Sequence, residues 1–186
     1  SSPSRLSTNP AATLDPVRDI VEVVGLPGFR EPVASFTHLF GAAAALAAAP
    51  SLWMRARRHG AKTWTIHLFW MACVTLLAIS GTYHMFSPDT TPREVMKRLD
   101  VAAIFFFIAS TCTPLYALLF KGIARWAMLI AVWAVAITGI TLRTIFFDQT
   151  HSWFGLAIFL SMGWMGASAS FVIWRRYGFG YLSRLV

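Results

Sequence analysis

The chain has 186 residues, of which 56% are hydrophobic and only 13% are charged, and its mean hydropathy is +0.59. Few soluble domains of this length have such a composition, whereas membrane proteins with several spans commonly do. The formal net charge of +8 would suit a nucleic-acid partner. However, the basic residues lie in short stretches between apolar runs, which is typical of membrane loops, so we expect no nucleic-acid partner.

Residues 1–30 are mostly polar, contain four prolines, and include no long apolar segment of the kind found in a secretory signal. We expect this region to be a polar N-terminal tail. The transmembrane helical domain is expected over residues 31–174. Residues 175–186 form a basic C-terminal end, which we expect to be the start of a sixth helix.

Five apolar segments of the transmembrane domain are each long enough for a helix to cross a bilayer, which takes about 20 residues. They are expected near 33–53, 64–86, 101–120, 124–147 and 152–174. Tryptophans, whose indole rings favour the headgroup region, lie at the ends of these segments: Trp53, Trp64, Trp126, Trp153 and Trp174. The predicted fold class is therefore all-α, a polytopic transmembrane helix bundle with five spans present.

The short connections require successive spans to alternate in direction, and this sorts the loops between two membrane sides. One side receives the N-terminal tail, the 87–99 loop and the 146–151 turn, with all eight acidic residues and seven basic ones. We call it the mixed side. The opposite side, which we call the basic side, has nine basic residues and no acidic one. Its basic residues are Arg55, Arg57, Arg58, Lys62, Lys121, Arg125, Arg175, Arg176 and Arg184.

The mixed side gathers ionisable side chains at the ends of the spans. An ionisable group at the centre of a membrane helix costs roughly 2.5–3.5 kcal/mol on insertion scales, so such groups usually serve chemistry or transport. Ser80 and His84 are four residues apart on one helix face, and Glu31 and His38 are seven apart on nearly one face. The loop from His84 to Asp100 is too short to carry these two residues far apart. Imidazole and carboxylate groups that converge in this way would suit a zinc site with three protein ligands and an open position for water.

Each of these residues also has a purely structural interpretation, which the sequence leaves open. His84 would then hydrogen-bond a carbonyl near the interface. Asp100 would cap the third helix, an ordinary role for a carboxylate at a helix N-terminus. His38 would be a satisfied hydrogen-bonding residue within the membrane.

Glu31 would, on the structural interpretation, only pair with Arg30 or Arg93. The other histidines are expected to be structural or interfacial: His59, His67 and His151.

Three stretches of the transmembrane domain form a recognisable set: Glu31…Thr37-His38, Ser80-Gly-Thr-Tyr-His84, and Arg98-Leu-Asp100 followed by Ala109-Ser-Thr-Cys-Thr-Pro114. Together they resemble the hemolysin III family, within the wider group of progestin and adipoQ receptors and alkaline ceramidases. The resemblance covers about residues 31–174. It implies a seven-helix membrane protein, of which this sequence looks like the first five helices.

The resemblance also implies a zinc ion held among the helices, with His84 as a ligand. It implies that Asp100 holds or activates the zinc-bound water and that Ser80 supports the transition state, while Glu31 and His38 form a candidate accessory polar site. The family takes its other zinc histidines from a His-x-x-x-His pair in its last helix, and this sequence contains no such pair.

A zinc site of this kind suits the hydrolysis of membrane lipid amides or esters, so we expect membrane lipids as partners and a lipid as substrate. The expected location is the plasma (inner) membrane. A pore or ion-handling protein, with His84, Asp100 and Glu31 lining a polar path, is an alternative. A receptor-like binding protein without catalysis is another. The sequence identifies neither the substrate nor the oligomeric state.

Overall fold

The computed structural model describes residues 29–58, 62–88, 90–147 and 152–178. Its helices are α1 (Pro32–Arg58), α2 (Thr63–Tyr83), α3 (Thr91–Leu119), α4 (Gly122–Thr144) and α5 (Ser152–Tyr177). All five are long and apolar enough to cross a membrane. The prediction of an all-α transmembrane bundle with five spans is confirmed. The expected N-terminal tail up to residue 28, His59, His151 and residues 179–186 lie outside the described residues.

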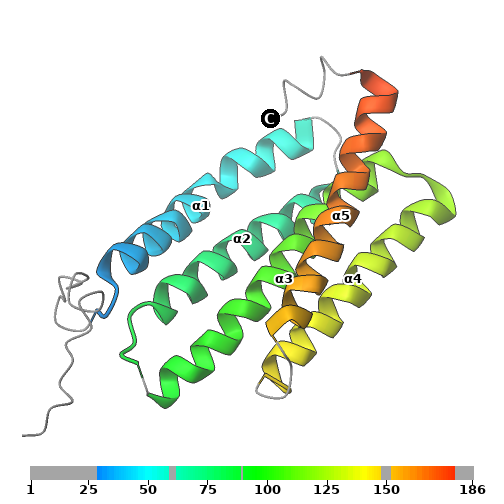
Figure 1. The fold of residues 1–186 in the computed structure, drawn as a ribbon. Helices are drawn as coiled ribbons and strands as arrows, with labels where there is room; N and C mark the ends of the chain where they lie inside the picture. The colour runs from blue at the N-terminus through cyan, green and yellow to red at the C-terminus, as the bar shows by residue number, and fades with distance from the viewer. Residues whose placement is uncertain (1–28, 59–61, 89, 148–151, 179–186) are drawn as a thin grey trace, which may run out of the picture.

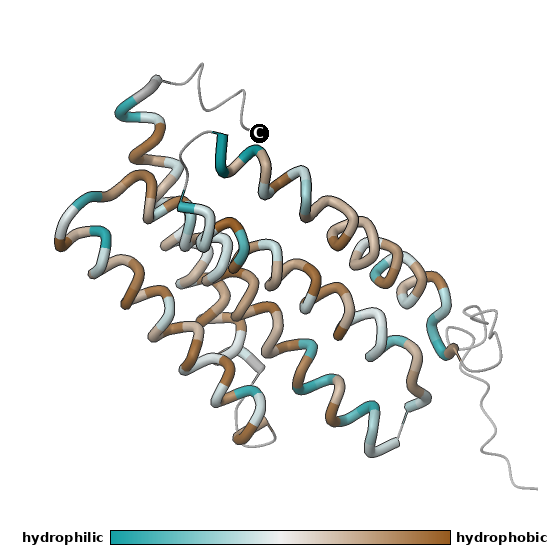
Figure 2. The backbone as a smooth tube through the Cα atoms, turned by 180° about the vertical axis from the view of Figure 1, so that it is seen from behind, coloured by the Kyte–Doolittle hydropathy of each residue, from teal (hydrophilic) through white to brown (hydrophobic). Residues whose placement is uncertain are grey.

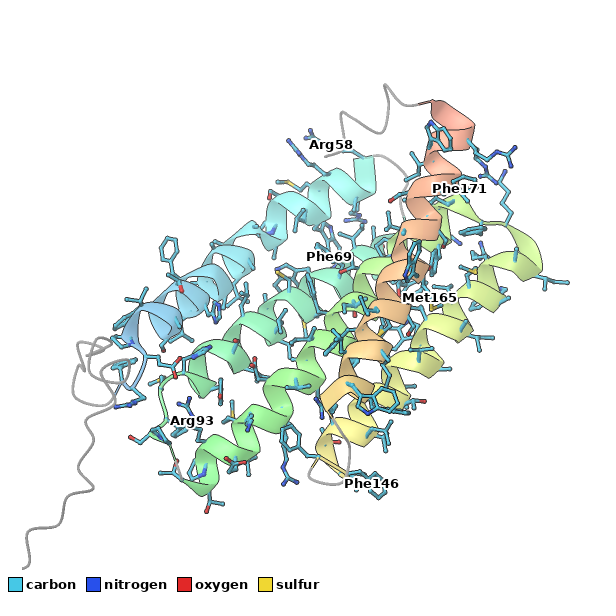
Figure 3. The ribbon with its side chains drawn as sticks, in the orientation of Figure 1. Arg58, Phe69, Arg93, Phe146, Met165 and Phe171 are labelled. Carbon is cyan, nitrogen blue, oxygen red and sulfur yellow. The ribbon has the colours of Figure 1, made fainter. Side chains whose placement is uncertain are left out.

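Successive helices run in opposite directions, and α1, α2, α3 and α4 form a row in which each packs on the next (Figure 1). α5 contacts both α3 and α4, so α3 is the central helix of the bundle. Hydrophilic residues lie mostly toward the helix ends (Figure 2). Arg93 lies at the mixed side and Arg58 at the opposite, basic side (Figure 3).

The main core lies between α3, α4 and α5, where Phe105, Tyr116, Val132 and Met162 are fully buried. Gly139 of α4 makes room for Phe105, because a Cβ at this position would lie 2.7 Å from Cε1 of the ring. Close approach of helix backbones at small residues is a common way to pack membrane helices.

α3 begins at Thr91 and not near residue 101, where the apolar segment starts. Pro92 occupies the first turn, where its missing N–H costs no helical hydrogen bond, and Glu94 places a negative charge near the helix N-terminus. These charged residues extend the helix beyond the apolar segment, a feature that hydropathy does not detect. Asp100 therefore lies inside α3, and its interpretation as a helix cap is wrong.

α1 packs on α2 through small residues at the mixed side. The hydroxyl of Ser35 donates a hydrogen bond of 2.8 Å to the carbonyl of Gly81. A Cβ on Gly81 would lie 2.8 Å from Cγ of Leu39, so the glycine sets how closely the two helices approach. This close contact holds the start of α1 against the end of α2, where the candidate site lies.

Candidate functional site

Glu31 immediately precedes α1 and connects the ends of three helices through its carboxylate. Its Oε2 is 2.6 Å from Nδ1 of His84 in the turn after α2, and its Oε1 accepts a hydrogen bond of 2.9 Å from Nη2 of Arg93 in α3. The backbone N–H of Glu31 also donates to the carbonyl of His84, at 3.1 Å. Arg93 uses its Nη1 to donate to the carbonyl of Phe86, at 2.6 Å. The carboxylate is thus held in place from two sides.

The hydrogen bond from Arg93 has the largest effect on the pKa of Glu31 and lowers it. Burial, the next largest effect, raises this pKa, and contact with His84 lowers it, so the net shift is downward. Glu31 is therefore an acceptor at neutral pH. Because a carboxylate only accepts, the Nδ1 of His84 carries the proton in this pair. Nε2 of His84 is then the nitrogen left with a lone pair for another partner when the ring is neutral.

Tyr83 completes the cluster formed by Glu31, His84 and Arg93. The guanidinium of Arg93 lies 4.6 Å from the centroid of the Tyr83 ring, and the rings of Tyr83 and His84 are 5.0 Å apart. Arg93 was one of two partners expected for Glu31 from the sequence, whereas Tyr83 was not expected at the site. The position of Tyr83 next to His84, within the Ser80–His84 stretch, could have indicated it.

His38 reaches the same cluster from α1. The centroid of its ring is 5.5 Å from that of His84, and its Nδ1 is buried without a hydrogen-bond partner. The interpretation of His38 as a fully satisfied hydrogen-bonding residue is therefore wrong for this nitrogen. Leaving a buried imidazole nitrogen without a hydrogen-bond partner costs free energy. Such nitrogens are therefore candidates for binding a ligand, a water or an ion.

Ser80 lies one helical turn before His84 on the same face of α2 and is buried. The backbone N–H of His84 donates to the carbonyl of Ser80, at 3.2 Å, which keeps the two residues in helical register. Ser80 therefore lies deeper in the bundle than the cluster around Glu31.

The depth of Asp100 follows from two ring contacts between α2 and α3. Arg93 lies against Tyr83, and the ring of Phe107 is 5.9 Å from that of Phe69. Arg93, Asp100 and Phe107 follow one another at seven-residue spacing, so they share one face of α3.

Asp100 lies midway between these contacts and is therefore near the level of Leu76, one turn deeper than Ser80. The backbone of Asp100 is therefore deeper in the bundle than that of His84. Its Oδ1 is buried and has no hydrogen-bond partner.

The structure thus brings together Glu31, His38 and His84, and it places Ser80 and Asp100 progressively deeper on neighbouring helices. Within the described part of the chain, no group of three or more His, Cys, Asp or Glu side chains is arranged to hold a metal ion. The donors that fit zinc are the Nε2 of His84, the unpartnered Nδ1 of His38 and the unpartnered Oδ1 of Asp100. They match the chemistry of a zinc site without completing it.

These features define a multi-pass membrane helix bundle with an ionisable site near one of its two ends. The family described as "Haemolysin-III related" matches residues 28–184, and the chain belongs to this family. The expected resemblance is therefore confirmed.

Two curated relatives are similar over most of the chain. A hemolysin-3 homolog of Bacillus subtilis (strain 168) is 29% identical over 140 residues, which cover 73% of this chain and 64% of the relative. Hemolysin-3 of Bacillus cereus is 27% identical over 139 residues, covering 73% and 63% respectively. The chain thus spans just under two thirds of the length of both relatives. No solved structure matches it.

Proposed function

We propose that this hemolysin III family member is a zinc-dependent hydrolase of membrane lipid amides or esters, with its reaction centre between α1, α2 and α3. The hydrogen bond of 2.6 Å between His84 and Glu31 carries the proposal. Histidines that bind zinc usually donate their other ring N–H to a carboxylate or carbonyl, which fixes the tautomer and orients the ring. The carboxylate of Glu31 accepts this hydrogen bond from the Nδ1–H of His84, so Nε2 is the proposed ligand atom.

Side-chain direction favours an approach between His84 and Asp100. In an α-helix each Cα–Cβ bond tilts toward the N-terminus. α2 and α3 run in opposite directions, so the bond of Asp100 tilts toward the mixed side. His84, in the turn that ends α2 with helical dihedrals, tilts deeper into the bundle. This reduces the separation of their backbones, with Ser80 lying between them in depth.

When bound, zinc supplies Lewis acidity toward a carbonyl oxygen and makes a water molecule more acidic. In this proposal the free Oδ1 of Asp100 accepts the proton of the attacking water. The hydroxyl of Ser80 donates a hydrogen bond to the carbonyl oxygen as negative charge develops on it. His38 contributes a ligand or a hydrogen bond through Nδ1. A catalytic zinc usually has three protein ligands and an open position for water, and with Asp100 acting as the base, His84 and His38 supply at most two, so the proposal requires a further donor from outside the described residues.

Zinc analysis of the protein purified from membranes in detergent tests the proposal. We expect about one zinc per chain in the wild type, by analogy with single catalytic zinc sites, and its loss in His84→Ala. His67→Ala is the matched control, because His67 is a partly buried histidine of the same helix whose Nδ1 bonds the Thr63 carbonyl at 2.7 Å. It should keep the metal.

Turnover would be followed with an amide-linked and an ester-linked lipid that carry the same acyl chain. A wild-type protein without zinc, or one whose hydrolysis of both lipids survives His84→Ala unchanged, would contradict the proposal.

A further inference from the structure

A groove between α1 and α2 lies near the basic side, at the opposite end of the bundle from the candidate hydrolase site. It has a volume of about 430 Å³, within the range of roughly 300–1,000 Å³ that is usual for ligand pockets. Its walls are almost entirely apolar, and they include Ala49, Pro50, Trp53, Ile66, His67 and Trp70.

The aromatic wall of the groove is fixed by specific contacts. The indole N–H of Trp70 donates a hydrogen bond of 2.6 Å across the helix interface to the carbonyl of Ala45. The ring of Trp53 meets that of His67 edge to face, with centroids 4.6 Å apart. Because both tryptophans are positioned in this way, the groove is already formed without a ligand.

Positive charge lies beside the groove where α1 ends. Arg57, in the last turn of α1, is four residues after Trp53 on the same helix face, and its guanidinium lies 5.5 Å from the centroid of the Trp53 ring. Arg58 stands at the end of the helix (Figure 3).

Among the described residues, no acidic side chain lies near the groove to balance this positive charge. The sequence contains no acidic residue between Glu31 and Asp89. Both ion pairs found in the described part of the chain involve Glu31, at the other end of the bundle. The arginines therefore attract an anion at the level of the lipid headgroups, where Trp53 marks the end of the apolar part of α1.

We propose that this groove binds one anionic phospholipid. An acyl chain lies against Trp53, Ile66 and Trp70, and Arg57 binds the phosphate. Guanidinium groups bind phosphate oxygens with paired hydrogen bonds, which a sterol cannot offer, and they favour a net anionic headgroup over phosphatidylcholine, whose choline cation offsets its phosphate charge. An apolar groove next to unbalanced arginines thus matches both parts of an anionic phospholipid, and the inference does not depend on the hydrolase proposal.

Native mass spectrometry can test this inference on the protein released from nanodiscs that contain phosphatidylglycerol and phosphatidylcholine with identical acyl chains in equal amounts. We expect the wild type to retain one phosphatidylglycerol in preference to phosphatidylcholine. The variant Arg57→Gln should lower the ratio of retained phosphatidylglycerol to phosphatidylcholine by about fivefold, since each basic residue near an anionic surface contributes to binding. Ala49→Trp, which fills the groove, should abolish retention of both lipids.

Arg125→Gln is the matched control. Arg125 also belongs to the basic side and lies over a tryptophan, 5.4 Å from the centroid of Trp126, but Trp126, unlike Trp53, does not line the groove. This variant should behave as the wild type. Glycerophosphoglycerol, which has the headgroup without acyl chains, should not displace the retained lipid.

Three results would overturn the proposal. They are equal retention of the two phospholipids by the wild type, an equal loss of preference in Arg125→Gln and Arg57→Gln, and displacement by glycerophosphoglycerol. Arg57→Gln changes an exposed residue, so it tests the proposal even if Ala49→Trp fails to fold.

Discussion

Arg93 and Glu31 are 62 positions apart in the sequence and form an ion pair of 2.9 Å at the mixed side. Among the described helices, α1 packs on α2 and makes no contact with α3. The pair therefore ties the segment before α1 to the start of α3 across the end of α2. The geometry around His84 depends on this link, because the same carboxylate holds the imidazole.

The stability of the protein should fall at acidic pH because of Glu31. The pKa of Glu31 is lowered in the folded protein, first of all by the hydrogen bond from Arg93. The stabilisation is therefore fully present above the unfolded value near 4.5 and is lost as the pH falls through the folded value. We expect the melting temperature in detergent to drop below about pH 4.5 in the wild type. Glu31→Gln should show a smaller drop over this range, and equal drops would contradict the role of Glu31.

Asp100→Asn should retain zinc but lose most turnover, because an amide does not accept a proton from water. Removal of a general base commonly lowers the rate by about 10²–10⁴-fold. Metal content and lipid hydrolysis would be measured on the same preparation. Glu94→Gln, in the first turn of the same helix, is the control and should leave both unchanged. Wild-type turnover in Asp100→Asn would refute the proposed role in proton transfer.

Gly81→Ala should destabilise the bundle, because the added Cβ would lie 2.8 Å from Cγ of Leu39 and 3.2 Å from its backbone nitrogen. Overpacking of this kind typically costs about 1–3 kcal/mol. Gly163→Ala offers a control, since no atom lies within 4 Å of the new Cβ. It should be neutral or stabilising by up to about 1 kcal/mol, owing to the higher helix propensity of alanine. Denaturation in mixed detergent micelles measures both variants, and similar losses would show that packing at Gly81 is unimportant.

Tyr116→Phe should weaken the contact between α3 and α5. The buried hydroxyl of Tyr116 donates a hydrogen bond of 2.6 Å to the carbonyl of Met165. Ser168 also donates to this carbonyl, so the acceptor keeps one partner in the variant. We therefore expect a loss near the membrane-protein average of about 0.6 kcal/mol. Tyr83→Phe is the comparison, because its hydroxyl is 3.5 Å from Arg93 and makes at most a weak hydrogen bond. A larger loss of stability in Tyr83→Phe than in Tyr116→Phe would contradict this prediction.

Several parts of the candidate site were predictable from the sequence. The four-residue spacing of Ser80 and His84 predicted that they share a helix face, and the structure keeps them one turn apart. Glu31 lies just before α1, so it does not share a helix face with His38, although both residues lie beside His84. The spacing did not reveal that His84 pairs with Glu31 while Asp100 lies deeper. The relative depth of His84 and Asp100 depends on the register between α2 and α3. The contacts of Arg93 with Tyr83 and of Phe107 with Phe69 indicate this register.

The sequence alone determined the number of membrane-crossing helices and their alternating direction, because a bilayer requires about 20 apolar residues per helix with its backbone hydrogen bonds made internally. It also determined that the described acidic side chains, Glu31, Glu94 and Asp100, belong to one side. Only the tertiary structure decided which side chains meet. The small residues at Ser35 and Gly81 set the distance between α1 and α2, and the aromatic contacts of Trp53 and Trp70 shape a groove at the other end. Such contacts join residues far apart in the chain, so local hydropathy and periodicity do not predict them.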